Sequence, residues 1–266
     1  MDRRAFLGTV AVGAAGGLAG CALEAPTRSE GADRPLGRSG FPADICTAPP
    51  QNDPGVYAIT DPVFGEDWVG RSLRSHYVGG EHDGEVAPRP DGLPPETTVV
   101  GIEREGTPRA YPLTVLWVHE VVNDTIAGLP LLVTYCSLCR SAMVARRTVE
   151  AAETTFRATG LLWAAPRLQE AVAAEQGRVV GAVLTGGQER QVRHSGNVVL
   201  RDDATGSYWS QILARSICGP VEGTLLSQVP ATISTWEEWR GTHPETSVLL
   251  PPPYSGTTRH AASVED

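Results

Sequence analysis

The sequence predicts a mainly β member of the α+β class, folded as a compact single domain of short antiparallel strands with a few short helices. Two features lead to this prediction. Short runs rich in Val, Ile, Thr and Tyr recur along the chain, and clusters of Gly, Pro, Asn and Asp separate them. Helical spacing of apolar residues is limited to a few short segments. Many short strands with few helices indicate one domain built around sheets.

The clearest local structure begins at Thr97. Two strand-like runs, 97–104 and 108–111, flank Glu105-Gly106-Thr107, which predicts a β-hairpin with a glycine turn. Pro112 then suits the first position of a helix. Four apolar residues at helical spacing would form its buried face: Leu113, Leu116, Trp117 and Val121. We expect this helix to end near Asn123-Asp124.

A short apolar strand follows and ends in Cys136-Ser-Leu-Cys139. Because residues 142–147 resemble a return strand, we expect the two cysteines to lie in a β-turn and not at the start of a helix. Further short strands are predicted at 155–159, 179–184, 191–194, 198–201 and 208–211. A surface helix is expected at 166–176. A capping box from Thr235 to Glu238 opens a last short helix that contains Trp236 and Trp239 as core residues.

The N-terminus predicts export and a lipid anchor. Arg3-Arg4 form a twin-arginine pattern, and a small apolar stretch follows from Leu7 to Leu18. That stretch is shorter than the roughly 20 apolar residues that a membrane span needs. The run 18–21 resembles a lipobox, so Cys21 is the expected site of lipid attachment. We therefore expect the protein to be exported and anchored to the outer face of the cytoplasmic membrane.

The charge balance excludes one class of partner. The 22 basic residues, all of them arginine, are outnumbered by 31 acidic ones, and the net charge is −9. A moderately acidic chain without a basic run argues against nucleic-acid binding, and it leaves the lipid anchor as the expected contact with the membrane. Beyond Cys21 the chain has Cys46, Cys136, Cys139 and Cys218. A Cys46–Cys218 bridge is one pairing that this even number allows, and other pairings or free thiols stay open.

Several ordered motifs resemble domain-of-unknown-function family 3179. The matching segments are Arg109-Ala-Tyr-Pro112, Trp117-Val-His119-Glu-Val-Val-Asn123-Asp124, Val133-Thr-Tyr-Cys136-Ser-Leu-Cys139-Arg-Ser-Ala142, Gly160-Leu-Leu-Trp163, Gly206-Ser-Tyr-Trp209-Ser210-Gln211, Gly219-Pro220 and Thr235-Trp236-Glu-Glu-Trp239. Ser137 stands where the family usually has Pro, and Arg140 where it usually has Gly. The resemblance covers 99–250 and carries no established activity. Together with the leader pattern and the composition of the two ends, it divides the chain into a signal peptide (1–20), a tether with an irregular lead-in (21–52), the family domain (53–250, with an insertion at about 164–196) and a loosely ordered tail (251–266).

The C-x-x-C pair predicts a reactive site, and we expect a soft-metal centre there. Two thiolates three positions apart chelate one copper or zinc ion, and His119 on the preceding helix would supply a third ligand. Three protein ligands with one open position are typical of a catalytic or copper-type site. Six further residues are expected beside the ligands or in the pocket wall: Glu120, Asn123, Arg140, Trp209, Ser210 and Gln211.

Two other functions fit the same residues. Cys136 and Cys139 can exchange thiols with disulfides, since export places them in an oxidising compartment and the charge of Arg140 would favour a thiolate. A binding or scaffold domain without catalysis, with structural disulfides, is the third. No G-x-S-x-G elbow and no Gly-rich phosphate loop occur, so serine hydrolases and nucleotide-binding enzymes of those types find no support.

Overall fold

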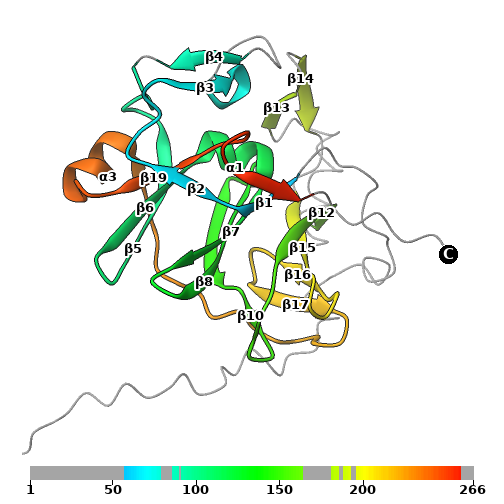
Figure 1. Cartoon of the computed structure of the whole chain (residues 1–266). Helices are drawn as coiled ribbons and strands as arrows, with labels where there is room; N and C mark the ends of the chain where they lie inside the picture. The colour runs from blue at the N-terminus through cyan, green and yellow to red at the C-terminus, as the bar shows by residue number, and fades with distance from the viewer. Residues whose placement is uncertain are drawn as a thin grey trace, which may run out of the picture.

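The computed structural model of the chain describes residues 57–78, 86–89, 91–163, 181–185, 188–192 and 196–258. Within them the fold is mainly β, as the sequence predicts, with two short α-helices and several sheets (Figure 1). The expected signal peptide, Cys21, Cys46 and the helix at 166–176 lie outside the described residues. No helix within the described residues has the length and apolar character needed to cross a membrane.

The central sheet carries the cysteine pair. Its strands, in spatial order, are β20 (Gly256–Thr258), β1 (Ala58–Asp61), β7 (Val121–Ile126), β8 (Leu129–Cys136) and β9 (Ser141–Arg146). The β1–β7 pair is parallel and the other pairs are antiparallel. Leu131 and Val133 of β8 enter one hydrophobic core, whereas Leu132 and Cys136 enter another. Because alternate side chains of a strand point to opposite faces, both faces of this sheet are buried.

One face of the central sheet packs against a second sheet and both α-helices. The second sheet consists of β18 (Thr232–Thr235), β5 (Thr98–Arg104), β6 (Thr107–Pro112), β19 (Ser247–Leu250) and β2 (Val63–Gly65), with β6 and β19 parallel. Helix α1 (Leu113–His119) follows β6, and α3 (Trp236–Thr242) follows β18. The core that joins these elements includes Tyr111, Leu116 and Trp239, all fully or almost fully buried.

The other face packs against a third, antiparallel sheet of β12 (Phe156–Trp163), β15 (Asn197–Asp202), β16 (Tyr208–Ser210) and β17 (Arg215–Cys218). Asn123 of β7 links the two sheets: its side-chain oxygen accepts from Phe156 N at 2.7 Å, and its amide donates to Phe156 O at 2.9 Å. The smaller elements are the hairpins β3 (Arg71–Arg74)/β4 (Val86–Arg89), β10 (Thr148–Val149)/β11 (Ala152–Glu153) and β13 (Gly181–Thr185)/β14 (Gln188–Val192), and the 3-10 helix η2 (Ser75–Val78).

Two local predictions are confirmed. Glu105 and Gly106 both have positive φ (50° and 72°) in the two-residue turn between β5 and β6, and a glycine favours such a turn. The side chain of Thr235 caps α3 by accepting from Glu238 N, while the Glu238 carboxylate accepts from Thr235 N. The expected core residues Trp236 and Trp239 are only 3% and 4% exposed.

The structure corrects the end of the first helix. Helix α1 stops at His119, because Glu120 adopts the left-handed conformation with φ 56°, and Val121–Ile126 form β7 instead of a last helical turn. Val121 and Val122 are β-branched, which favours a strand, and they pair with Thr134 and Val133 of β8. Residues that helical spacing placed in the helix therefore belong to a strand.

The structure also corrects the first part of the expected tail. Gly256–Thr258 form β20, which pairs antiparallel with β1, and Pro251 and Ser255 are buried. The hydroxyl of Ser255 donates to Leu250 O and accepts from Val63 N, so the segment is held in place by side-chain contacts as well as by strand pairing. The remaining tail, 259–266, lies outside the described residues.

Candidate functional site

The cysteine pair lies in a tight turn between β8 and β9. Cys136 ends β8, Ser141 begins β9, and the two residues pair across the turn 137–140. The backbone N–H of Cys139 donates to the Cys136 sulfur at 3.4 Å. Arg140 is exposed and has φ 50°, a conformation that glycine adopts with less strain. This backbone conformation accounts for the Gly that the family pattern usually has at this position.

The sulfur of Cys139 is surrounded by polar partners. Ser141 Oγ lies 3.0 Å from it, and the side-chain amide of Asn197 donates to it at 3.1 Å. The backbone N–H of Ile212 donates to Asn197 Oδ1 at 2.9 Å. Because that bond fixes the amide oxygen, the nitrogen of Asn197 is the end that faces the sulfur. Donors directed at a sulfur stabilise its ionised form.

Gln211 holds both of these partners in place. Its Oε1 accepts from Asn197 Nδ2 at 2.5 Å and from Ser141 Oγ at 3.0 Å, while its Nε2 donates to Ser141 O at 2.9 Å. The Gln211 side chain is fully buried, and Asn197 is 5% exposed. Asn197 and Gln211, which lie 58 and 70 positions after their partners in the turn, thus form one hydrogen-bonded network around Cys139.

Cys136 has the opposite environment. It is buried, and its thiol donates to Gly196 O at 3.5 Å. A carbonyl oxygen accepts a proton but gives none, so it favours the neutral thiol. Cys136 and Cys139 are both free cysteines, without a disulfide between them. The single Cys136 proton therefore points either to Gly196 O or to the Cys139 sulfur.

These environments separate the two thiol pKa values. The hydrogen bond from Cys136 lowers the pKa of Cys139 to about 5 against the opposing effect of burial, and Ser141 and Asn197 lower it further. The same hydrogen bond between the two side chains raises the pKa of Cys136, and burial raises it further. Cys139 is also the more exposed of the two. These contacts therefore favour ionisation of Cys139 over ionisation of Cys136.

Glu120 adds a carboxyl group to this site. Its backbone oxygen accepts from Tyr135 N at 3.0 Å, which places it beside the residue that precedes Cys136. Burial first, and then the charge of Cys139, raise the pKa of the Glu120 carboxyl to about 7. A carboxyl with this pKa can hold or release a proton near neutral pH.

His119 points elsewhere. Its Nδ1 donates to Tyr57 O at 2.7 Å, and its Nε2 accepts from the Tyr77 hydroxyl at 2.7 Å. Burial lowers its pKa to about 4, so the imidazole is neutral. In the described residues no three His, Cys, Asp or Glu side chains gather in a way that could hold a metal ion. The structure therefore does not bring His119 to the two cysteines.

The other expected site residues divide in two. Gln211 contacts the Cys139 network, and Glu120 is coupled to it, whereas Asn123, Trp209 and Ser210 have structural contacts. Trp209 is fully buried, donates its indole N–H to Asp202 at 2.8 Å and packs on Phe156. The Ser210 hydroxyl accepts from Leu213 N at 3.4 Å.

Sequence reasoning did not select Ser141 and Asn197, the two residues that contact the Cys139 sulfur through their side chains. Ser141 stands in the quoted cysteine motif and could have been found there. Asn197 carries only a weak signal, a polar residue directly before a predicted strand.

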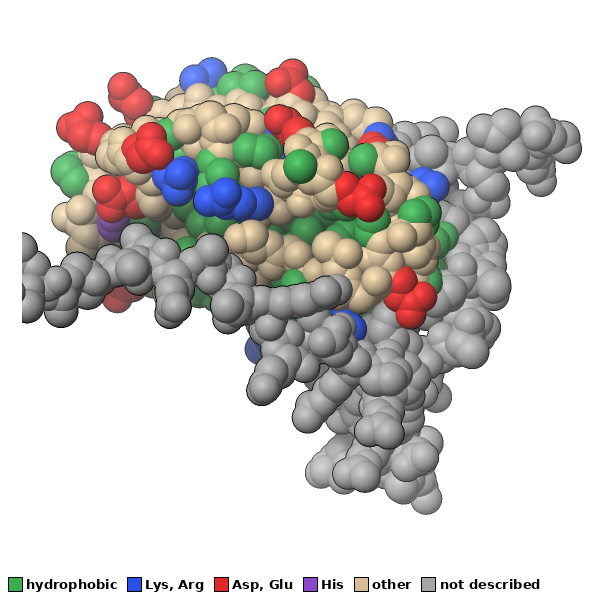
Figure 2. Space-filling model, turned by 90° about the horizontal axis from the view of Figure 1, so that it is seen from below, with side chains coloured by type: hydrophobic (Ala, Val, Ile, Leu, Met, Phe, Trp, Pro, Cys, Tyr) green, Lys and Arg blue, Asp and Glu red, His purple; other side chains and the backbone are tan. Residues whose placement is uncertain are grey.

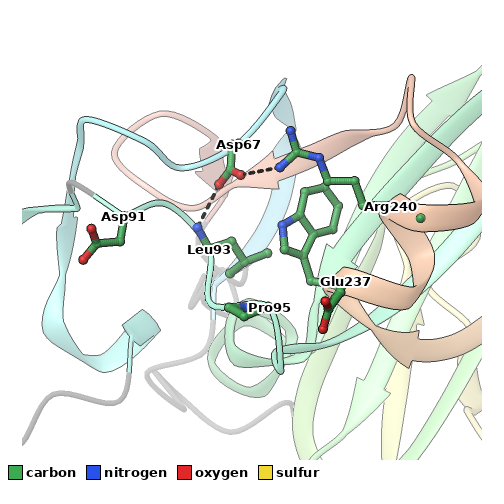
Figure 3. Close-up of a pocket in the computed structure, with 8 residues that line it drawn as sticks. Asp67, Asp91, Leu93, Pro95, Glu237 and Arg240 are labelled. Carbon is green, nitrogen blue, oxygen red and sulfur yellow. Dashed lines mark hydrogen bonds and ion pairs between the residues drawn. The ribbon is translucent and has the colours of Figure 1, made fainter.

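A groove of about 240 Å³ opens beside the Cys139 network. Its lining includes Ser141 and Gln211, the two residues that join it to the sulfur. A second pocket, of about 370 Å³, lies next to α3 (Figure 3). The Asp67 carboxylate in that pocket accepts from Trp68 N and Leu93 N and pairs with Arg240, so its contacts serve the fold. We place the candidate active site at the thiols.

Acidic and basic side chains do not form separate patches on the face of the molecule seen from below. Figure 2 shows acidic and arginine side chains interspersed there with hydrophobic ones. No curated protein and no solved structure matches the chain. One family model matches it, over residues 83–168 and 169–262, which together make up more than half of the sequence. The chain therefore belongs to the family described as protein of unknown function DUF3179.

Proposed function

We propose that this protein carries out thiol–disulfide exchange with Cys139 as the nucleophile and Cys136 as the second, resolving thiol. The observation that carries the proposal is the difference between the two sulfurs. Cys139 receives a hydrogen bond from the Asn197 amide and has Ser141 Oγ 3.0 Å away, whereas Cys136 is buried against a carbonyl oxygen. One ionised, accessible thiol next to a protonated, buried one is the arrangement that two-step exchange requires.

The chemistry proceeds in two displacements. The Cys139 thiolate attacks one sulfur of a substrate disulfide, which forms a mixed disulfide and releases the other substrate sulfur as a thiolate that takes a proton from solvent. Cys136 then loses its proton and attacks the Cys139 sulfur. This forms the Cys136–Cys139 disulfide and releases the second substrate thiol. Two electrons pass from the protein dithiol to the substrate, and the reverse sequence oxidises a substrate dithiol.

Glu120 is the group to which we assign the proton of Cys136. Its backbone is hydrogen bonded to Tyr135, the neighbour of Cys136, and its carboxyl is coupled to the Cys139 charge. A carboxyl with a pKa near 7 accepts a proton from a thiol and returns it at neutral pH more readily than an ordinary carboxyl, since the best general base titrates near the working pH.

A soft-metal site is the second candidate, and one observation favours it. The Cys139 N–H that donates to the Cys136 sulfur is the kind of turn amide that supports thiolate ligands in metal knuckles. A copper or zinc ion held by Cys136 and Cys139 alone would need its remaining ligands from outside the described residues or from a partner. Metal content measured on protein purified without chelator tests this candidate.

Export and anchoring remain part of the proposal on sequence grounds. Arg3-Arg4 and Cys21 support a lipoprotein on the outer face of the cytoplasmic membrane. Replacing Arg3 and Arg4 by Lys should retain the protein in the cytoplasm. Unchanged export of that double variant would contradict twin-arginine routing.

The decisive experiment treats the reduced protein with dithiobis-nitrobenzoate, a disulfide that releases a coloured thiolate. In wild type, Cys139 reacts quickly at pH 7, and mass spectrometry then finds a Cys136–Cys139 disulfide. Cys136→Ser stops at the mixed disulfide on Cys139, and Cys139→Ser leaves Cys136 unreactive. A Cys136–Cys139 bridge that resists reduction, or equal reactivity of both thiols, contradicts the proposal. One tightly bound metal per chain that blocks the reaction supports the metal candidate instead.

A further inference from the structure

Strand β9 has an open stretch on the outer edge of the central sheet. The segment 227–229 pairs with its second half, where Arg146 N donates to Ser227 O at 2.8 Å and Val229 N donates to Val144 O at 2.9 Å. After Val229 the chain reaches Pro230, which has no N–H, and leaves toward β18. Among the described residues no strand pairs with the first half of β9 on this side.

The register of the sheet determines which backbone groups face this opening. Val144 O and Arg146 N point away from β8, toward the segment 227–229. Since residues two apart in a strand direct their backbone groups the same way, Ala142 directs its N–H and C=O to the same side. A short unpaired strand edge is a template for the backbone of another chain.

The groove of about 240 Å³ lies against this edge. Its lining contains no charged side chain: Ser141, Ala142, Met143, Val144, Gln211, Ile212, Gln228, Val229 and Ala231. A small anionic thiol such as glutathione carries two carboxylates and would call for arginine partners. The groove is also smaller than the roughly 300–1,000 Å³ of pockets that enclose drug-sized ligands or cofactors. Neutral amide and apolar groups beside a free strand edge suit a peptide backbone.

The groove also reaches the nucleophile. Ser141 lines it and has its hydroxyl 3.0 Å from the Cys139 sulfur. Ile212, 55% exposed, provides an apolar side chain at the lining. A strand added to β9 would lie about 4.8 Å from it. A cysteine of that strand opposite Ser141 would lie on the same sheet face as Met143, which shares a hydrophobic cluster with Cys139, and so would come close to the Cys139 sulfur.

Resting on the thiol exchange proposed above, we propose that the groove binds an extended segment of a cysteine-containing protein. That segment adds to β9 as a strand and presents its disulfide to Cys139. Strand addition of this kind draws its affinity from main-chain hydrogen bonds and its selectivity from pockets for alternate side chains. The substrate class is therefore a protein disulfide in an extended segment, and not a small anionic disulfide.

The test uses the full chain with Cys136→Ser, which retains the mixed disulfide. Three probes carry the same activated disulfide: a neutral six-residue peptide with one central cysteine, the same peptide N-methylated at single positions, and glutathione. We expect the unmodified peptide to react about tenfold faster than glutathione, the effect of one or two hydrogen bonds. N-methylation should lower the rate at alternate positions only, because an added strand turns every second N–H toward β9.

A variant and a binding measurement complete the test. Ala231→Trp fills the groove and should lower the peptide rate about tenfold, whereas Val69→Trp, at an exposed site outside the groove, should leave it unchanged. A peptide with Ser in place of Cys should slow amide hydrogen exchange at Ala142. Equal rates for peptide, methylated peptides and glutathione would overturn strand binding while leaving thiol exchange intact. If Cys139 reacts with none of the probes, the proposed function fails instead.

Discussion

The side-chain nitrogen of Asn197 lies 3.1 Å from the sulfur of Cys139, a residue 58 positions earlier in the chain. Ile212 N donates to the amide oxygen of Asn197 and so sets its orientation. The first residue of β15 thereby contacts the turn between β8 and β9 across the boundary of two sheets. The chemistry of the thiols therefore depends on how the third sheet packs against the central one.

Asn197→Ala should raise the pKa of Cys139. A hydrogen bond to a charged group contributes about 1.5–3 kcal/mol, which corresponds to roughly 1–2 pKa units, and partial exposure of the sulfur favours the lower end. The rate of Cys139 alkylation against pH measures this, with a wild-type midpoint at about 5. Thr246→Ala, which removes a buried bond to the Trp239 indole, is the matched control and should not move the midpoint. An unchanged midpoint in Asn197→Ala would remove the amide from the mechanism.

Glu120→Gln should slow the second displacement and spare the first. Glutamine has the shape of the carboxyl but takes no proton from Cys136, so the mixed disulfide on Cys139 should persist about tenfold longer at pH 7. This is less than the roughly 10²–10⁴-fold effect of a general base, because water partly replaces the carboxylate. Rapid-quench mass spectrometry of the mixed disulfide follows both steps. A variant that slows both steps equally would show only a structural role for Glu120.

The same substitution should change how stability depends on pH. Burial raises the Glu120 pKa from 4.5 to about 7, so the folded state holds this proton more tightly than the unfolded state. The free energy of unfolding of the wild type must then fall as pH rises from about 4.5 through about 7. Each unit of pKa shift is about 1.4 kcal/mol, and solvent at the partly exposed Glu120 side chain reduces the effect. Glu120→Gln should therefore be more stable than wild type by roughly 1–2 kcal/mol at pH 8 and equal near pH 4.5. Urea unfolding at the two pH values measures the difference.

His119→Gln should weaken the fold without changing the thiols. Two buried hydrogen bonds, to Tyr57 and Tyr77, are disturbed, which costs roughly 1–3 kcal/mol at pH 7. The His119 pKa falls from 6.5 to about 4 on burial, so the unfolded state binds this proton first and stability is lost as pH falls through that window.

The stability lost between pH 7 and pH 5 should therefore be smaller in His119→Gln than in wild type or in the control His243→Gln. Thermal unfolding at pH 7 and pH 5 gives the stabilities, and Cys139 alkylation should stay at the wild-type rate. A bound metal that disappears in His119→Gln would restore the histidine as a ligand.

Arg140→Gly should stabilise the turn. The left-handed conformation costs a residue with a Cβ about 1–2 kcal/mol. Glycine avoids this cost, but its greater freedom in the unfolded chain destabilises the folded state by about 0.4–1 kcal/mol. A net gain of roughly 0.5–1 kcal/mol in urea unfolding is expected. Arg140→Ala keeps the Cβ and removes the charge, so it should show no gain. Equal stability of the two variants would mean that charge, and not backbone strain, governs this position.

The sequence by itself determined those features that depend on neighbours in the chain. The Glu105-Gly106 turn, the Thr235–Glu238 capping box and the position of Cys136 and Cys139 between two strands follow from residues within a few positions of each other. The family follows from ordered motifs of the same local kind. Turn and cap chemistry is short-range, and for that reason it can be read from one sequence.

Only the tertiary structure decided which side chains reach the thiols. Periodicity continued the first helix through Val121, but the left-handed Glu120 ended it. The backbone of Glu120 then accepts from Tyr135 N, next to Cys136, while the His119 ring contacts Tyr57 and Tyr77. Asn197, at the start of β15, and Gln211, directly after β16, reach the turn because the third sheet covers the opposite face of β8. Contacts between sheets depend on the packing of distant segments and on burial, and neither leaves a spacing pattern in the sequence.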